Sequence, residues 1–378
     1  MLFRSRVAAI PDVPTFIEAG LPEYQAGNWI GFAAPAGTPK TIVDKLHQEI
    51  AAVQDMNRFI PLLFVLAAST AATQAQDYPT RPITIISGIP AGSGTDIFAR
   101  IFGERMKTPL GQPLIVENIT GAGGTIGTTR AARAAPDGYT LSVGNIGTHV
   151  VSPATYPNIQ YHPINDFEPV ALFVTTPYWL LAKKDFPAND LKGLIGWLKA
   201  NPDKASLAMV GTGGIDQIVG TYFQQQTGTR FQFVPYRGGG PATQDVVAGH
   251  VDLRFDAVSG SLAPLRSGQL KAYAVMGKTR TPAAPEIPTT DELGVPGLHV
   301  TFWFGLWAPK GTPRPIIARL NAAVAEAFDD PGVQRRIAEL GADVPPRQMQ
   351  TAEAFGAFHK AEVEKWWPFI KSANIKAE

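Results

Sequence analysis

Four glycine-rich turns are the residues of this chain best suited to bind an anion. They lie at residues 89–96, 118–127, 211–214 and 236–241, and each follows a predicted strand and opens a predicted helix. Glycine lets a backbone approach a ligand closely, and the free N–H groups of a helix start attract negative charge. Four such turns predict one anion site, for example for a carboxylate, at the carboxyl ends of the strands.

Motifs for other chemistry are incomplete. Gly92-Ser93-Gly94 lacks the third glycine of a dinucleotide-binding turn, because Ile97 stands at that position. Gly277-Lys278-Thr279 imitates the end of a Walker A loop, but Ala272 occupies the place of its first glycine. The sequence contains no G-x-S-x-G elbow to present a serine nucleophile. Phosphate-loop and serine-hydrolase chemistry are therefore not predicted.

The composition narrows the function classes further. The chain has no cysteine, which excludes disulfides and thiolate metal sites, and its six histidines are scattered. His149 and His162 could act as general bases, although a lone histidine is more often a packed or surface residue. The formal net charge is +1 and no Lys/Arg cluster occurs, so nucleic acid is not an expected partner. We expect no cofactor and no metal.

The elements that position these turns alternate in the manner of an α/β protein. Strands are predicted at residues 83–86, 114–116, 140–143, 207–210, 231–234, 251–255, 272–276 and 302–307. Helices are predicted at 95–106, 125–134, 217–226, 242–248, 262–266, 315–328 and 352–370. The last helix carries an aromatic stripe that predicts a core-facing side. Two crossings of the chain between lobes are predicted at strand ends, near 170–176 and 276–285.

One segment of the chain occurs twice. Fifteen residues between Pro11 and Leu46 recur, without a gap, 274 positions later between Pro285 and Leu320. Solenoid repeats have periods of about 20–50 residues and occur in three or more copies, so these two distant copies indicate a duplicated fragment. We predict that residues 1–55 are a fragment of a similar protein and not part of the core fold.

A segment typical of a secretory signal peptide follows the first copy. Residues 56–75 begin with Met56-Asn57-Arg58, continue through about ten apolar residues and end in small and polar residues. Ten helical residues rise about 15 Å, half of a bilayer core, so a membrane span is a poor interpretation. A short buried helix is the remaining alternative. We predict export, with Met56 as the biological start and the mature chain beginning at residue 76 or 77.

Read in order, the motifs of residues 77–378 resemble the periplasmic solute-binding receptors of tripartite tricarboxylate transporters, the Bug family. The resemblance rests on residues 78–83, 90–100, 116–118, 121–124, 135–141, 234–238, 249–256 and 308–313. It implies an α/β, two-domain type II periplasmic-binding-protein fold with a ligand cleft between the lobes. Residues 77–175 with 285–378 would form lobe 1, and residues 176–284 would form lobe 2.

The same resemblance implies where a ligand would be held, largely by backbone N–H groups. In the first lobe the contacts would be Pro90, Gly92, Ser93, Gly94, Thr95, Asp96, Asn145, Gly147, Thr148 and His149. In the second lobe they would be Gly211, Thr212, Gly213, Gly214, Arg237, Gly238, Gly239 and Asp256. Thr95, Asp96 and Asp216 could instead be helix N-caps, and Arg237 could be a surface residue.

Two residues depart from the family pattern. Ile89 stands where an aromatic residue is usual, and Asp216-Gln217 replaces a more usual Ser/His-type pair. A carboxylate at Asp216 would repel an anion unless it caps its helix.

The resemblance implies a monomeric periplasmic receptor, without catalytic residues, that delivers a small di-, tricarboxylate or aromatic carboxylate to separate membrane subunits. An enzyme on the same scaffold and a sensor that presents its ligand to a signalling partner are the alternatives, because a fold does not dictate a function. An enzyme would consume the ligand, whereas a receptor would close on it without turnover.

Overall fold

The computed structural model describes residues 38–54 and 78–377. The chain divides into two compact units, Met1–Thr73 and Gln74–Glu378. The predicted signal peptide at residues 56–75 and most of the first copy lie outside the described residues, so both interpretations stay predictions.

The described part of the first copy is a helix, α1 (Lys40–Gln54), whose first and last positions correspond to those of α10 (Arg314–Phe328) at the same offset. The two helices differ in what their apolar faces contact. Leu320 of α10 is fully buried, whereas the corresponding Leu46 of α1 is 51% exposed and Ile42 is 50% exposed. The first copy of this helix therefore does not bury the face that the second copy buries.

Deletion of residues 1–55 should leave the unfolding midpoint of the second unit within about 1 °C, because residues 74–378 form a compact unit with core clusters of their own. Urea and thermal unfolding of residues 77–378 and of the whole chain measure this. Substitution of Leu320 by Ala, by contrast, should cost about 2–5 kcal/mol, because the side chain leaves a cavity in a packed core. An insoluble product from residues 77–378 would contradict the prediction.

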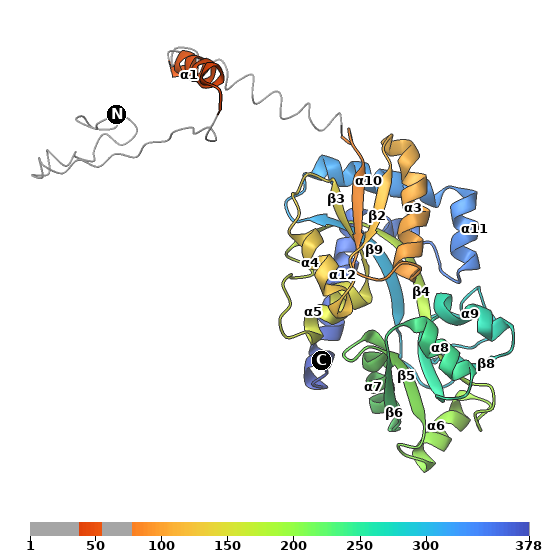
Figure 1. Cartoon of the computed structure of the whole chain (residues 1–378). Coiled ribbons are helices and arrows are strands. Elements are labelled where there is room, and N and C mark those ends of the chain that lie inside the picture. The colour runs from red at the N-terminus through yellow and green to blue at the C-terminus, as the bar shows by residue number, and fades with distance from the viewer. Residues whose placement is uncertain (1–37, 55–77, 378) are drawn as a thin grey trace, which may run out of the picture. The chain divides into compact units, whose positions relative to one another are not determined.

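The second unit is built on one mixed sheet of nine strands (Figure 1). Its strands are β1 (Ile83–Ser87), β2 (Leu114–Asn118), β3 (Thr140–Asn145), β4 (Phe167–Lys183), β5 (Ser206–Val210), β6 (Gln232–Tyr236), β7 (Leu253–Ala257), β8 (Leu270–Val275) and β9 (Thr301–Pro309). The order across the sheet is β2-β1-β3-β9-β4-β7-β5-β6, and β8 also pairs with β4.

Each end of this sheet has its own set of helices. The first end, around β1, β2 and β3, carries α3 (Gly94–Leu110), α4 (Thr125–Ala132), α10 and α11 (Pro331–Glu339). The second, around β5, β6 and β7, carries α6 (Leu191–Ala200), α7 (Ile215–Thr227), α8 (Gly239–Val247) and α9 (Val258–Arg266). Figure 1 shows the two sets as separate bodies, which we call the first and second lobe.

Parallel pairing in each lobe explains where the turns lie. β1 pairs in parallel with β2 and β3, and β5 pairs in parallel with β6 and β7. Parallel strands require helical crossovers, and the turn from each strand into its helix emerges at the same edge of the sheet. The glycine-rich turns predicted from the sequence therefore gather where the lobes face each other.

The crossing between lobes differs from the prediction. Residues 170–176 do not lie at a strand end, because β4 runs unbroken for 17 residues and pairs antiparallel with β9 along most of its length. Two register shifts, between Pro169/Ala171 and Leu172/Val174, interrupt that pairing. The lobes are thus joined by a two-stranded ribbon whose hydrogen bonds continue across the junction.

The last helix, α12 (Ala352–Ser372), packs as its aromatic stripe predicts. Phe355 and Trp366 are buried in the largest core cluster, and Phe358 and Phe369 pack against it. The helix contacts β4 of the central ribbon, and its Trp366 and Phe369 also pack edge-on to Tyr222 of α7 in the second lobe. The C-terminal segment therefore touches elements of both lobes.

Candidate functional site

A cavity of about 630 Å³ lies where the turns of both lobes meet. Every one of the four glycine-rich turns predicted from the sequence contributes to its wall. The first supplies Gly92–Thr95, the second Gly123, the third Gly211–Gly214, and the fourth Arg237, Gly239 and Gly240. The shared site expected from the turns is thus a single cleft with contributions from both lobes.

Four helices begin at this cavity. The starts of α3, α7, α8 and α9 reach it through Gly94 and Thr95, Gly214 and Ile215, Gly239 and Gly240, and Ser259 and Gly260. The first N–H groups of a helix have no partner within the helix and carry a partial positive charge. Helix starts converging from two lobes therefore favour a ligand with an anionic group.

One side of the cavity is apolar. Phe302 and Phe304 of β9 line it with ring centroids 5.1 Å apart, and Ile97 and Phe98 of α3 continue the surface. An apolar wall beside polar helix starts matches a small organic acid, because its hydrocarbon part also leaves water on binding.

The cavity brings together thirteen of the eighteen site residues proposed from the sequence. They are Gly92, Ser93, Gly94, Thr95, Asn145, Gly147, Gly211, Thr212, Gly213, Gly214, Arg237, Gly239 and Asp256. Pro90, Asp96, Thr148, His149 and Gly238 do not border it. The assignment of all eighteen to ligand contact stays a prediction.

Thr148 and His149 lie behind the cavity wall and support it. Asn145 donates a 2.8 Å hydrogen bond from Nδ2 to Thr95 Oγ1, and its backbone N–H donates to Thr148 Oγ1 at 3.0 Å. His149 is fully buried and stacks on Trp307 with a centroid distance of 3.7 Å. His149 is therefore a packed core residue, the alternative to a general base, and it has no access to a ligand in the cavity.

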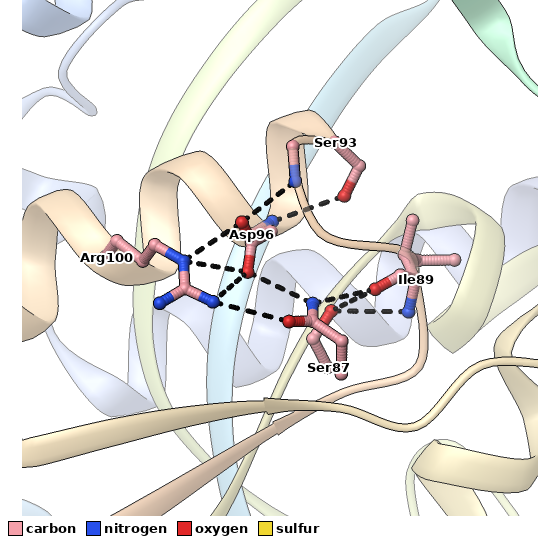
Figure 2. A network of polar contacts seen from close by, with 7 residues as sticks. Ser87, Ile89, Ser93, Asp96 and Arg100 are labelled. Carbon is pink, nitrogen blue, oxygen red and sulfur yellow. Dashed lines mark hydrogen bonds and ion pairs between the residues drawn. The ribbon is translucent and has the colours of Figure 1, made fainter.

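Asp96 holds the first turn in shape (Figure 2). Its carboxylate accepts from Arg100 Nε at 3.0 Å, from the Gly92 N–H at 3.0 Å and from Asn118 Nδ2 at 3.0 Å. Burial raises the pKa of Asp96, but the Arg100 hydrogen bond and those of Gly92 and Asn118 outweigh it and hold the pKa below its ordinary value. The N-cap of α3 is Ser93, so the N-cap interpretation of Thr95 and Asp96 is wrong.

Asp216 is likewise not a cap, because α7 is capped by Gly214. Its carboxyl group is buried, accepts from the Tyr178 hydroxyl at 2.9 Å and from the Val210 N–H at 2.9 Å, and borders the cavity. Burial raises the pKa of Asp216 to about 6 against the attraction of Arg254, and repulsion from Asp256 adds to the increase. The positive charge of Arg254 offsets part of the repulsion that this carboxylate would exert on an anion.

The raised pKa of Asp216 predicts a pH dependence of stability. A carboxyl pKa that is higher in the folded than in the unfolded chain stabilises the fold when protonated, so this contribution is lost as pH rises from about 4 to 6. The unfolding free energy of Asp216→Asn minus that of wild type should therefore increase by on the order of 2 kcal/mol from pH 4 to pH 7.5.

Urea unfolding at several pH values measures this difference. Asp245→Asn is the matched control, because the Tyr236 hydrogen bond holds the pKa of Asp245 below its ordinary value and reverses the sign of the slope. A difference between Asp216→Asn and wild type that is constant with pH would contradict the prediction.

Sequence reasoning missed Arg254, which borders the cavity and is almost fully buried. Its Nη2 donates to Asp256 Oδ1 at 3.1 Å. A signal was available, because residues two apart on a strand share a face, and Asp256 had been placed at the cleft. Arg237 was the cation named instead among the second-lobe contacts.

Within residues 38–54 and 78–377, no group of three His, Asp or Glu side chains is arranged to hold a metal ion. Over the same ranges, none of the helices combines the length and the apolar character that crossing a bilayer requires.

A model of the tripartite tricarboxylate transporter family receptor matches residues 1–81 and 98–375. Solved structures are also similar. MatC (Rpa3494) from Rhodopseudomonas palustris with bound malate is 38% identical, with a TM-score of 0.71 over 78% of this chain and 100% of that chain.

The periplasmic binding protein BugD is 39% identical, with a TM-score of 0.71 over 80% of this chain and 100% of its own. Rpa4515 from R. palustris with adipate is 29% identical, with a TM-score of 0.73 over 79% of this chain and 99% of that chain.

Proposed function

Because this chain belongs to the tripartite tricarboxylate transporter receptor family, we propose that it captures a small carboxylate in its cleft and delivers it to a membrane transporter. Its fold is the two-lobed type II periplasmic-binding-protein fold of the Bug receptors. We assign residues 77–175 and 285–378 to the first lobe and residues 176–284 to the second.

One observation carries the choice of ligand, namely the four helix starts that converge on one cavity with an apolar wall. Each can give backbone N–H groups to carboxylate oxygens, and together they can hold an anion without a full positive charge from a side chain. The malate bound to MatC and the adipate bound to Rpa4515 support a ligand with carboxylate groups and a short carbon chain.

The rest of the proposal concerns where and with what the receptor works. We place it in the periplasm, as a monomer, after removal of the signal peptide predicted at residues 56–75. The membrane subunits of a tripartite transporter are its partners, and it releases its ligand chemically unchanged. The aromatic carboxylates remain candidates, because Phe302 and Phe304 offer ring faces to the cavity.

A thermal-shift screen of residues 77–378 against mono-, di- and tricarboxylates, aromatic ones included, tests the function. Ligand binding to the folded state alone raises apparent stability by about 2.7 kcal/mol at a concentration of 100 Kd. We expect a concentration-dependent increase in Tm with at least one carboxylate, and nuclear magnetic resonance should recover that ligand unaltered after incubation. No shift with any carboxylate would overturn the proposal, and ligand turnover would indicate an enzyme.

A further inference from the structure

The second-lobe wall of the cavity contains a buried cluster of charged groups. Arg254 and Asp256 lie two residues apart on β7, and Asp216 and Tyr178 reach the same place from α7 and β4. All four residues border the cavity, and all four are at least nine-tenths buried. The cluster therefore belongs to the cleft and not to the outer surface of the lobe.

The guanidinium of Arg254 is incompletely bonded. It is 2% exposed, and Nη2 donates to Asp256 Oδ1, but Nε and Nη1 have no hydrogen-bond partner among the described residues. Burial of a charged group without hydrogen-bond partners costs free energy, and native structures rarely contain such a group. These two nitrogens indicate a partner that the protein chain does not supply.

The fourth turn packs on the guanidinium through its backbone. A Cβ built on Gly239, at the start of α8, would stand 3.2 Å from Arg254 Nη2. Gly239 and Gly240 both border the cavity, so no side chain of the fourth turn covers the guanidinium at these two positions. Arg254 Nε and Nη1 have almost no accessible surface, so a ligand in the cleft reaches them when the guanidinium rotates or the turn moves.

The charges around Arg254 decide what kind of contact it can make. Asp256 pairs with it directly, and Asp216, with a pKa of about 6, is a second carboxylate that is mostly ionised beside it near neutral pH. The charge of Arg254 is thus offset, so it adds little long-range attraction. What it offers is the geometry of a guanidinium edge, which matches the two oxygens of a carboxylate.

We propose that Arg254 is a specificity-determining residue that bonds a second carboxylate of the ligand through its Nη1–Nη2 edge. This inference rests on the proposed function and names its ligand class. One carboxylate lies on the start of α3 in the first lobe, and the carbon chain lies along Phe302 and Phe304. After a small rotation of the guanidinium plane, the second carboxylate accepts from Nη1 and from the N–H of Nη2 that Asp256 does not use. The receptor therefore prefers dicarboxylates to monocarboxylates of the same length.

Isothermal titration calorimetry with matched pairs of acids tests the inference. Succinate with butyrate and adipate with hexanoate differ by one carboxylate at constant carbon number. We expect wild type to bind the diacid of at least one pair 10-fold or more tightly than its monoacid. The double variant Arg254→Met/Asp256→Asn removes the ion pair as a unit, and Asp216 keeps its hydrogen bonds from Tyr178 and from the Val210 N–H. It should lose that preference and bind the monoacid within about 3-fold of wild type.

Arg230→Met/Asp203→Asn is the matched control, because this Arg–Asp ion pair of the second lobe does not border the cavity. It should retain the diacid preference. Arg254→Lys keeps the charge but loses the two-nitrogen edge, and it should lower the preference at least 5-fold. This variant decides the question if the double variant fails to fold.

Two results would overturn the inference. An unchanged diacid preference in the double variant, or in Arg254→Lys where only that variant folds, would make Arg254 a structural ion pair. Equal affinities of wild type for diacid and monoacid would show that the second carboxylate contributes nothing to binding. Failure of the proposed function is distinguishable, because wild type would then bind neither acid of any pair.

Discussion

Gly92→Val is expected to lower carboxylate affinity about 100-fold or more while costing the fold only a few kcal/mol. Gly92 borders the cavity with a φ of +78°, and a Cβ built on it meets no atom within 4 Å. A valine side chain would therefore project into the open space of the first turn and exclude a ligand oxygen from the start of α3. Each charge-assisted hydrogen bond lost contributes roughly 1.5–3 kcal/mol, so two account for the expected factor.

Gly111→Val is the matched control for this substitution. Gly111 ends the same helix, has a φ of +69° and likewise meets nothing within 4 Å, but it does not border the cavity. Both variants pay a similar backbone strain at positive φ, of about 1–2 kcal/mol. Calorimetry should find binding lost only in Gly92→Val. Equal affinities in the two variants would place the ligand elsewhere.

Gly213 does not offer the same test, although it is among the implied ligand contacts and borders the cavity. A Cβ there would meet the backbone of Ala377 at 2.7–2.9 Å, so valine would displace the C-terminal residues and not a ligand oxygen. Gly211 is the better position in the third turn. It borders the cavity, has a φ of +67° and meets nothing within 4 Å.

The second large effect is a loss of stability in acid, caused by two histidines in the core. Burial holds the pKa of His149 well below its ordinary value, and burial lowers the pKa of His359 to about 4. His359 Nε2 lies 2.8 Å from the His149 carbonyl oxygen and its Nδ1 accepts from Trp307 Nε1 at 3.3 Å, an arrangement that requires the neutral ring. Protonation would place a charge in this enclosed cluster.

The sign follows from the lowered pKa values. The two histidines contribute their full stability above the unfolded pKa of about 6.5, and this is lost as pH falls towards 4. His359 alone should account for roughly 2–3 kcal/mol between pH 7.5 and 4.5. His359→Gln keeps a donor and an acceptor without titrating, so it should remove that share of the slope. Phe358→Leu, on the same helix, removes no titrating group and should leave the slope unchanged.

Urea unfolding of both variants against wild type, at pH 7.5, 6 and 4.5, measures this share. Comparison with Asp216→Asn is informative, because Asp216 contributes with the opposite sign over part of the same range. Equal slopes in His359→Gln and wild type would show that the buried ring does not titrate on folding.

Local patterns predicted most of the fold because they depend on neighbours in sequence. All strands and helices expected from period and turn residues are present within the error of a few residues, from β1 to α12. β4 was missed because its run from Phe167 to Lys183 is apolar on both faces and contains Pro169 and Pro177, so it shows no alternation. A strand shared by two lobes is specified by its partners β9, β7 and β8, which no local pattern reveals.

The candidate site likewise contains features that depend on local sequence and features that depend on tertiary contacts. The glycine turns were predictable, because glycines and helix starts can be recognised from the local sequence, and all four turns reach the cavity. The position of Arg254 and the roles of Asp96 and Asp216 were not predicted. Their behaviour depends on burial and on partners such as Asn118 and Tyr178, which come from other strands.

The crystal structure of residues 77–378 with the carboxylate that stabilises them most tests the central claim directly. We expect one ligand in the cavity between the lobes. One of its carboxylate oxygens should lie within about 3.2 Å of backbone N–H groups at the start of α3, and the second lobe should supply further contacts. A ligand outside this cavity, or one held by Arg237 without contact to any helix start, would contradict it.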